Sequence, residues 1–166
     1  MAADYFLKFE GPELKGESRD SEMKDQIELT SWTFGASQNA TSRSTSGGPV
    51  GRVELHELSV TKLSDKATPQ LFLNCAKGQI FKTATLSVRK ATGDGKSQKP
   101  YMVVKLENAL ISGYNISGSD GGHAPSENIT LNFTKITYDY KMQDASKGTL
   151  TSAGAVSHDS ETGESK

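Results

Sequence analysis

The sequence lacks features that several common protein classes require. Cys75 is the only cysteine among 166 residues, so no disulfide can form within the chain. No apolar run approaches the roughly 20 residues of a membrane-spanning helix, which predicts no membrane insertion. The first residues have neither the basic nor the apolar region of a secretory signal peptide. We therefore expect the protein to start in a reducing cytoplasm.

The sequence also has almost no net charge. Its 19 basic and 20 acidic residues give a formal charge of −1, which provides no overall field to attract nucleic acid. Because self-repulsion is absent, the chain is not expected to be disordered throughout. The charge balance therefore predicts a folded protein that does not bind nucleic acid.

Apolar residues are distributed unevenly along the chain. They make up 34% of it, yet residues 36–52 and 143–166 consist mostly of Ser, Thr, Gly, Ala and charged residues. A chain of this length forms one domain. We therefore expect one folded domain over residues 1–142 and a flexible, disordered C-terminal tail over residues 143–166.

Most of the remaining sequence alternates between apolar and polar residues, as β-strands do. Strands are predicted over residues 5–10, 27–35, 53–60, 80–90, 101–106, 110–117 and 127–142. The apolar parity changes between Leu55 and Leu58, which predicts a bulge, and again near Thr134, which predicts a bend. The residues expected to face the core from the fourth strand are Ala84, Leu86 and Val88. The pattern indicates an all-β protein.

One short helix is predicted over residues 69–77. Thr68 is a candidate N-cap, and Gly78 can adopt the left-handed conformation that ends a helix. The side of the helix expected to face the core carries Leu71, Phe72 and Cys75. This position favours a small core residue at Cys75 over a nucleophile.

Side chains with catalytic or metal-binding chemistry are present but not arranged for it. His56, His123 and His158 are far apart in the sequence, and no pair has the spacing of metal ligands. The acidic residues between positions 10 and 25 alternate with basic ones, which favours a solvated loop over the carboxylate pair of a glycoside hydrolase. We predict no catalytic residues, no metal site and no cofactor.

Two polar segments remain as candidate interaction sites. The connection over residues 36–52 has no periodicity, and loops of this length are usually functional. The glycine-rich stretch over residues 118–122 fits an anion-binding nest or, more simply, a long turn between two strands.

A series of short segments, taken in order, carries a family resemblance. The segments are residues 5–11 (YFLKFEG), 15–20 (KGESRD), 27–38 (IELTSWTFGASQ), the loop with two adjacent glycines before residues 53–55 (VEL), 65–78, 86–90 (LSVRK), 118–122 (GSDGG) and 127–133 (ENITLNF). Together they resemble the hemolysin-coregulated protein (Hcp) family, whose members are tube subunits of bacterial type VI secretion. The resemblance covers about residues 5–142.

The resemblance implies both a fold and a function. The implied fold is a mainly β, compact antiparallel β-barrel of two packed sheets, with one short flanking α-helix and a long extended loop. The implied function is a structural one, in which hexameric rings stack into a hollow tube within a contractile sheath. Such rings carry small effector proteins in the lumen, load onto a spike protein and are expelled from the cytoplasm without a signal peptide.

The resemblance also assigns roles to the two polar segments. The glycine-rich loop is similar to a loop that faces the lumen, and the long loop is similar to the family's extended loop. Effector contacts are therefore expected at Gly118, Ser119, Asp120, Gly121 and Gly122. Ring or stacking contacts are expected at Gln38, Asn39, Thr41, Arg43, Ser46, Gly47 and Gly48.

Two other functions remain open. One is a monomeric ligand- or carbohydrate-binding β-barrel module, and the other is a hydrolase built on the acidic N-terminal segment. A binding module should present an exposed aromatic platform, whereas Trp32, the only tryptophan, alternates with strand residues as a core residue would. The tube subunit is therefore the preferred interpretation.

Overall fold

A computed structural model describes residues 3–38, 52–90, 99–122, 124–143 and 149–166 of the chain. The elements are β1 (Ala3–Glu10), β2 (Ile27–Leu29), β3 (Ser31–Thr33), β4 (Ala36–Gln38), β5 (Val53–Leu55), β6 (Leu58–Leu63), α1 (Thr68–Lys77), β7 (Ile80–Lys90), β8 (Met102–Ser117), β9 (Ser126–Asn132), β10 (Lys135–Gln143) and β11 (Leu150–Asp159). Nine strands form one sheet. Seven of them follow the path β2-β1-β7-β8-β9-β6-β3, while β10 pairs with β8 and β11 pairs with β10. A separate two-stranded sheet consists of β4 and β5. The prediction of a mainly β protein with one short helix is confirmed.

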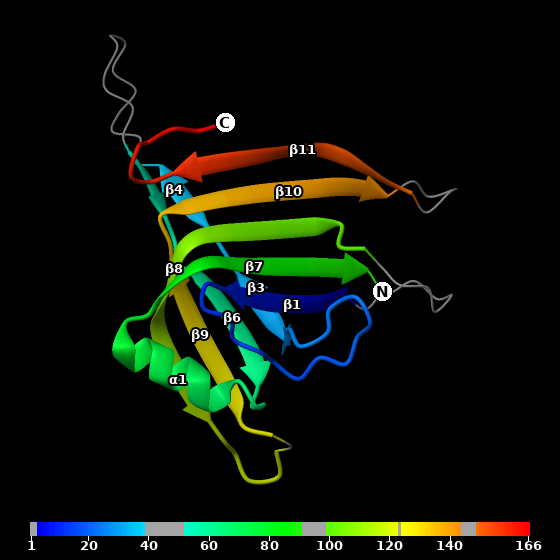
Figure 1. Ribbon diagram of the computed structural model, residues 1–166, viewed down its shortest axis with the longest axis vertical. Helices are drawn as coiled ribbons and strands as arrows, with labels where there is room; N and C mark the ends of the chain where they lie inside the picture. The colour runs from blue at the N-terminus through cyan, green and yellow to red at the C-terminus, as the bar shows by residue number, and fades with distance from the viewer. Residues whose placement is uncertain (1–2, 39–51, 91–98, 123, 144–148) are drawn as a thin grey trace.

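The central strand of the sheet is β8. One of its edges pairs with β7, and the other pairs with β10 over residues 102–107 and with β9 over residues 110–117. Asn108 lies between these two halves with a positive φ of 51°. Figure 1 shows β8 turning from the upper group of strands to run beside β9. The two strands predicted over 101–106 and 110–117 are therefore one strand. The polar residues between them do not end it, because the pairing with β7 keeps one register on both sides of Asn108.

Two predicted parity changes mark crossings between parts of the fold. The chain leaves the β4–β5 ribbon after Leu55 and enters the main sheet at Leu58, so the predicted bulge is a change of sheet. The segment predicted as one bent strand over residues 127–142 divides into β9 and β10 around Thr134, whose N–H donates to the Glu107 carbonyl at 3.1 Å. In both places the chain moves to a new neighbouring strand. The side chains that point inward then have the other parity in the sequence.

The predicted closed barrel of two packed sheets is not found among the described ladders. The path of the main sheet begins at β2 and ends at β3, and no described ladder joins these two strands. They are consecutive pieces of the segment predicted as one strand over 27–35, so they cannot pair with each other. The Thr30 N–H between them instead donates to the Thr61 carbonyl at 2.8 Å. The two ends of the sheet path are thus connected by the continuous backbone from β2 to β3, and not by a ladder between these strands.

The prediction of a disordered tail over residues 143–166 is wrong for residues 150–159. These residues form β11, which pairs antiparallel with β10. The last residues then return along β11, where Ser157 and Lys166 exchange two backbone hydrogen bonds of 2.8 and 2.9 Å. Most side chains of β11 are exposed, so its order comes from backbone pairing that an apolar pattern does not record.

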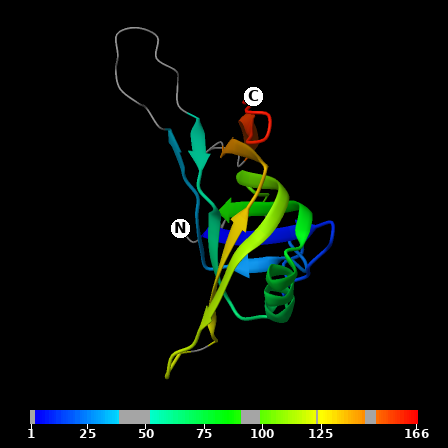
Figure 2. The same cartoon turned by 90° about the vertical axis from the view of Figure 1, so that its left-hand side faces the viewer.

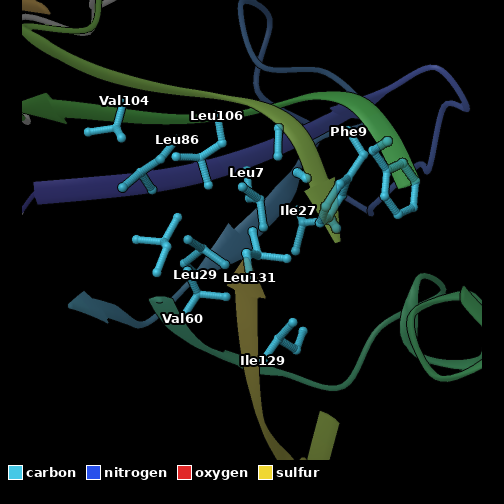
Figure 3. Packing of buried hydrophobic residues seen from close by; sticks show 14 of the residues in the cluster. Leu7, Phe9, Ile27, Leu29, Val60, Leu86, Val104, Leu106, Ile129 and Leu131 are labelled. Carbon is cyan, nitrogen blue, oxygen red and sulfur yellow. The ribbon is translucent and has the colours of Figure 1, made fainter. Parts of the chain in front are cut away.

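The hydrophobic core lies on the inner face of the curved sheet. Figure 3 shows leucine, isoleucine and valine side chains from six strands meeting there, beside Phe9. The Phe9 and Phe81 rings pack with centroids 4.5 Å apart. The prediction for the strand over 80–90 is confirmed, since β7 has these bounds and the residues predicted to face inward are fully buried or nearly so. Those residues are Ala84, Leu86 and Val88.

The helix α1 covers one end of this core. Leu71 is its only buried residue, and Phe72, predicted to face inward, is 59% exposed. The N-cap position belongs to Ala67 and has no side-chain cap, so the prediction of a Thr68 cap is wrong. Gly78 ends the helix in the left-handed conformation at φ 64°, as predicted. Within the described ranges, no helix has the length and apolar character needed to span a membrane.

Candidate functional site

A lysine and a glutamate lie side by side beneath the start of α1. Lys62 on β6 and Glu127 on β9 are both fully buried and form an ion pair. The Lys62 ammonium also donates to the Asp65 carboxylate at 2.9 Å and to the Leu63 carbonyl at 2.8 Å. An ammonium has three N–H donors, and each has an acceptor here. Lys62 therefore stabilises the fold, and its ammonium has no N–H left to donate to a ligand.

The glutamate receives two further hydrogen bonds. The Thr68 hydroxyl donates to Glu127 at 3.0 Å, and the Tyr114 hydroxyl donates to it at 2.6 Å. Burial raises the pKa of Tyr114 to about 12, and the hydrogen bond to the Glu127 carboxylate and its charge act in the same direction. We call this cluster the Lys62 network; its members are Lys62, Asp65, Thr68, Tyr114 and Glu127.

A signal for this network is present in the sequence, although no buried pair was predicted from it. Lys62 has the same strand parity as the buried Leu58 and Val60, and Glu127 has the parity of Ile129. A charged residue at an inward position of an apolar strand has to find a partner of opposite charge. One lysine and one glutamate at such positions therefore indicate a buried pair.

A second buried cation anchors the N-terminal loop. Arg89 on β7 donates to both carboxylate oxygens of Asp20, at 3.0 and 2.6 Å, and its guanidinium lies 4.6 Å from the centre of the Phe6 ring. Hydrogen bonds from Arg89 are the main reason that the pKa of Asp20 falls to about 2. Asp20 closes the KGESRD segment, so this segment fixes the loop to the sheet.

Several acidic residues near the N-terminus lie beside basic side chains. Glu10 pairs with Lys8 at 2.9 Å, and the hydrogen bond from Lys8 is the main cause that lowers the pKa of Glu10. Asp25 lies 3.9 Å from both Lys15 and Lys66. A glycosidase needs one carboxyl group with a raised pKa to act as the acid. The lowered pKa values of Glu10 and Asp20 are opposite to that requirement.

The two described histidines each lie beside a serine hydroxyl. His56 lies 3.4 Å from the Ser37 hydroxyl, His158 lies 2.8 Å from that of Ser165, and His123 is outside the described residues. Among the described residues, no group of three or more His, Cys, Asp or Glu side chains is placed to hold a metal ion.

The glycine-rich loop forms the tip of the β8–β9 hairpin. All five of its residues are exposed, and the Gly122 N–H donates to the Ser119 carbonyl at 3.2 Å. Gly121 has a φ of +77°, a conformation that favours glycine. Figure 2 shows this hairpin projecting beyond the body of the domain. The turn expected from the sequence is present, and the tip is available for contact with another molecule.

The residues predicted for ring or stacking contacts fall mostly outside the described part of the chain. Gln38 is described and lies exposed on β4. Asn39, Thr41, Arg43, Ser46, Gly47 and Gly48 are not among the described residues. The β4–β5 ribbon projects from the domain at the end opposite the β8–β9 tip (Figure 2). The β4–β5 ribbon, which includes Gln38, and the hairpin tip therefore lie at opposite ends of the described structure.

Exposed aromatic and apolar side chains gather where β10 and β11 extend beyond the core. The Tyr101 and Tyr140 rings meet edge to face with centroids 5.9 Å apart, and Tyr138 pairs in register with Val156. Tyr140, Met142 and Val156 are 40%, 54% and 59% exposed. We call Tyr101, Tyr138, Tyr140, Met142 and Val156 the tyrosine face. The sequence predicted strands at the other four residues, but it missed Val156, because β11 lies in the segment predicted to be a disordered tail.

A smaller uncovered group lies beside α1. The Phe72 ring contacts the Tyr114 ring edge to face at 5.9 Å, and Ile116, two residues farther along the same face of β8, is 44% exposed. We call Phe72, Tyr114 and Ile116 the helix patch. The tyrosine face and the helix patch lie on different parts of the molecule, one at the β10–β11 end and one near α1 (Figure 1).

Known proteins with similar sequences and structures belong to one secretion system. Residues 6–140 match the family model described as "Type VI secretion system effector, Hcp". Protein hcp1 of Pseudomonas aeruginosa is 37% identical over 145 residues, which are 87% of each chain. A solved structure of a type six secretion system protein matches with TM-score 0.89 at 28% identity, covering 99% of this chain and 100% of that one. The crystal structure of Hcp1 from Salmonella typhimurium matches with TM-score 0.77 at 28% identity, covering 100% of both.

Proposed function

The chain belongs to the Hcp family of type VI secretion proteins, and from this premise we propose that it is the structural subunit of a secretion tube. In this proposal six copies form a ring, and rings stack into a hollow tube within a contractile sheath. The observation that carries the proposal is the match to the family over residues 6–140 together with the 37% identity to Protein hcp1. The proposed role is structural and includes no catalytic step.

The two uncovered apolar surfaces support a ring of identical subunits. A head-to-tail interface joins two different surfaces of the same protein, and it closes into a ring when the rotation between neighbours divides a full turn. The tyrosine face and the helix patch are two such surfaces on one chain. Contact between the tyrosine face of one copy and the helix patch of the next would cover apolar area that a monomer exposes to water.

The projecting ends of the molecule provide the remaining proposed contacts. We assign stacking or ring contacts to the loop after Gln38, and effector contacts in the lumen to the hairpin tip with Ser119 at its centre. Effectors, a spike protein and the sheath are the proposed partners, since tube subunits of this family act with them. In this scheme the protein resides in the cytoplasm until firing, when the tube leaves the cell with its cargo.

A binding module remains a second candidate because of the tyrosine face. Stacking on tyrosine rings is one way in which proteins hold sugars, and Tyr140 exposes 40% of its surface. A monomeric carbohydrate-binding domain would use this face for a ligand, whereas a ring subunit would cover it with a neighbour. The two functions therefore predict different masses in solution.

The test is the mass of the purified protein by light scattering, combined with negative-stain images. The tube proposal expects a particle of six 17.8 kDa chains and ring-shaped projections. A species of one chain at all concentrations and salt conditions would contradict the proposal. Retention of that monomer on an immobilised polysaccharide would then favour the binding module.

A further inference from the structure

The helix α1 is held against the sheet by few apolar contacts. It has ten residues, of which Leu71 alone is buried, while Phe72 and Leu73 are 59% and 39% exposed. An isolated helix of this length is only marginally stable in water, so most of its stability has to come from packing. Leu71 and Ala67 are buried, Cys75 packs half-buried against the core, and the Phe72 ring contacts Tyr114, so apolar packing holds only one side of the helix. The docking of α1 therefore depends on other contacts at its N-terminal end.

The Lys62 network supplies contacts at that end. Asp65, in the turn before the helix, binds the Lys62 ammonium and also accepts a hydrogen bond from the Ala67 N–H at 2.9 Å. Thr68, the first residue of the helix, donates to Glu127 and accepts a hydrogen bond from the Asp65 N–H at 2.9 Å. The network thus connects the start of α1 to β6 and β9, with Tyr114 joining from β8.

We propose that the Lys62 network is a latch that holds α1 on the sheet, and that α1 opens as a unit when the latch is broken. Removing Lys62 leaves the Glu127 carboxylate buried without its cation, which is strongly destabilising in proteins. Opening of the helix relieves that cost, because water then reaches Glu127. Most of the core comes from the sheet, six of whose strands contribute the side chains shown in Figure 3, so we expect the sheet to remain folded when α1 opens. The proposal does not depend on the tube function.

Cys75 gives a direct measurement of the opening. It is the only cysteine, it lies on α1, and it packs half-buried against the core. A disulfide reagent such as Ellman's reagent labels a protected thiol through the open form, so the labelling rate follows the opening equilibrium. We expect Lys62→Met to raise the labelling rate of Cys75 at least about tenfold. All proteins are compared at one concentration, with their assembly state measured in parallel.

A matched control breaks the ion pair between the buried Arg89 and the partly exposed Asp20. Arg89→Met removes the partner of Asp20, which lies in the N-terminal loop and not at α1. This variant is also destabilised, but its Cys75 labelling rate should stay within about twofold of the parent, because the latch is intact. Equal acceleration in both variants would mean that labelling reports overall stability, and the proposal would be wrong.

Hydrogen exchange separates local opening from global unfolding. In Lys62→Met, amides of residues 68–77 should exchange faster, while those of β1 and β7 keep the protection of the parent. If Lys62→Met does not fold, Thr68→Val removes only the hydroxyl contacts and should accelerate labelling by about threefold. Unchanged labelling in the folded variant, or equal loss of protection in α1 and β7, would overturn the proposal.

Discussion

At the scale of single residues, Asp20 makes the stability of the protein depend on pH. Its pKa is lowered from 3.8 to about 2 in the folded state, mainly by hydrogen bonds from Arg89. A lowered pKa means that the stabilising contribution is complete well above pH 3.8 and is lost as the pH falls through about 2. Because Asp20 is partly exposed, the contribution is modest, about 1 kcal/mol.

The matching variant is Asp20→Asn. It should lower the free energy of unfolding by about 1 kcal/mol at pH 7 and by progressively less as the pH approaches 2, measured by urea denaturation. Glu22→Gln removes an exposed carboxylate from the same loop and serves as the control, with no comparable change expected. A difference between parent and Asp20→Asn that persists at pH 2 would contradict this account.

Single residues also show what sequence reasoning can and cannot detect. The turn at Gly121 was predictable, since glycine in a polar stretch between strands marks a turn. The Lys62 network joins distant parts of the chain, since Lys62 and Glu127 are 65 residues apart. Strand parity could have marked each residue as inward, but only the three-dimensional pairing of β6 with β9 brings them together.

At the scale of elements, alternation predicted strands well where one face is buried. The bounds of β7 were predicted because most of its side chains are buried and because Gly78, which ends the helix, lies just before it. β11 was missed, since an edge strand with exposed side chains is stabilised by backbone hydrogen bonds and needs no apolar pattern. The predicted closed barrel is not found among the described ladders, because which strands meet at the ends of a sheet depends on pairings that no local pattern specifies.

The strand β11 also protects the edge of β10, and its removal has a measurable consequence. Deleting residues 150–166 should leave the core folded but turn β10 into an uncovered edge, which favours association between sheets. We expect the truncated protein to keep its strand signal in circular dichroism and to form irregular aggregates, detected by sedimentation. If the segment were a flexible tail, the truncated and parent proteins would sediment alike.

At the scale of the whole molecule, assembly should depend on the tyrosine face. Tyr140→Ser removes an exposed ring from that face, and we expect dissociation of rings into folded monomers, measured by light scattering at micromolar concentration. Thr137→Ser, on the opposite face of β10, is the control and should assemble like the parent. Rings of equal stability in both variants would place the interface elsewhere.

Cargo binding provides a separate prediction for the hairpin tip. Ser119→Gln places a longer side chain on each copy of the tip without touching the core, since Ser119 is exposed. We expect rings of normal mass and melting temperature that retain several-fold less effector in co-purification, because six added side chains would crowd the lumen. Equal effector yields from parent and variant would remove Ser119 from the proposed contact site.

The single strand β8 has a mechanical consequence. Its 16 residues join, in one backbone, a residue next to the tyrosine face and the hairpin tip. A force applied along either half of β8 runs parallel to that half and across its hydrogen bonds to the neighbouring strands. Those bonds have to shear together instead of separating one at a time. The subunit should thus be stiff when pulled along β8 and more compliant when pulled across it.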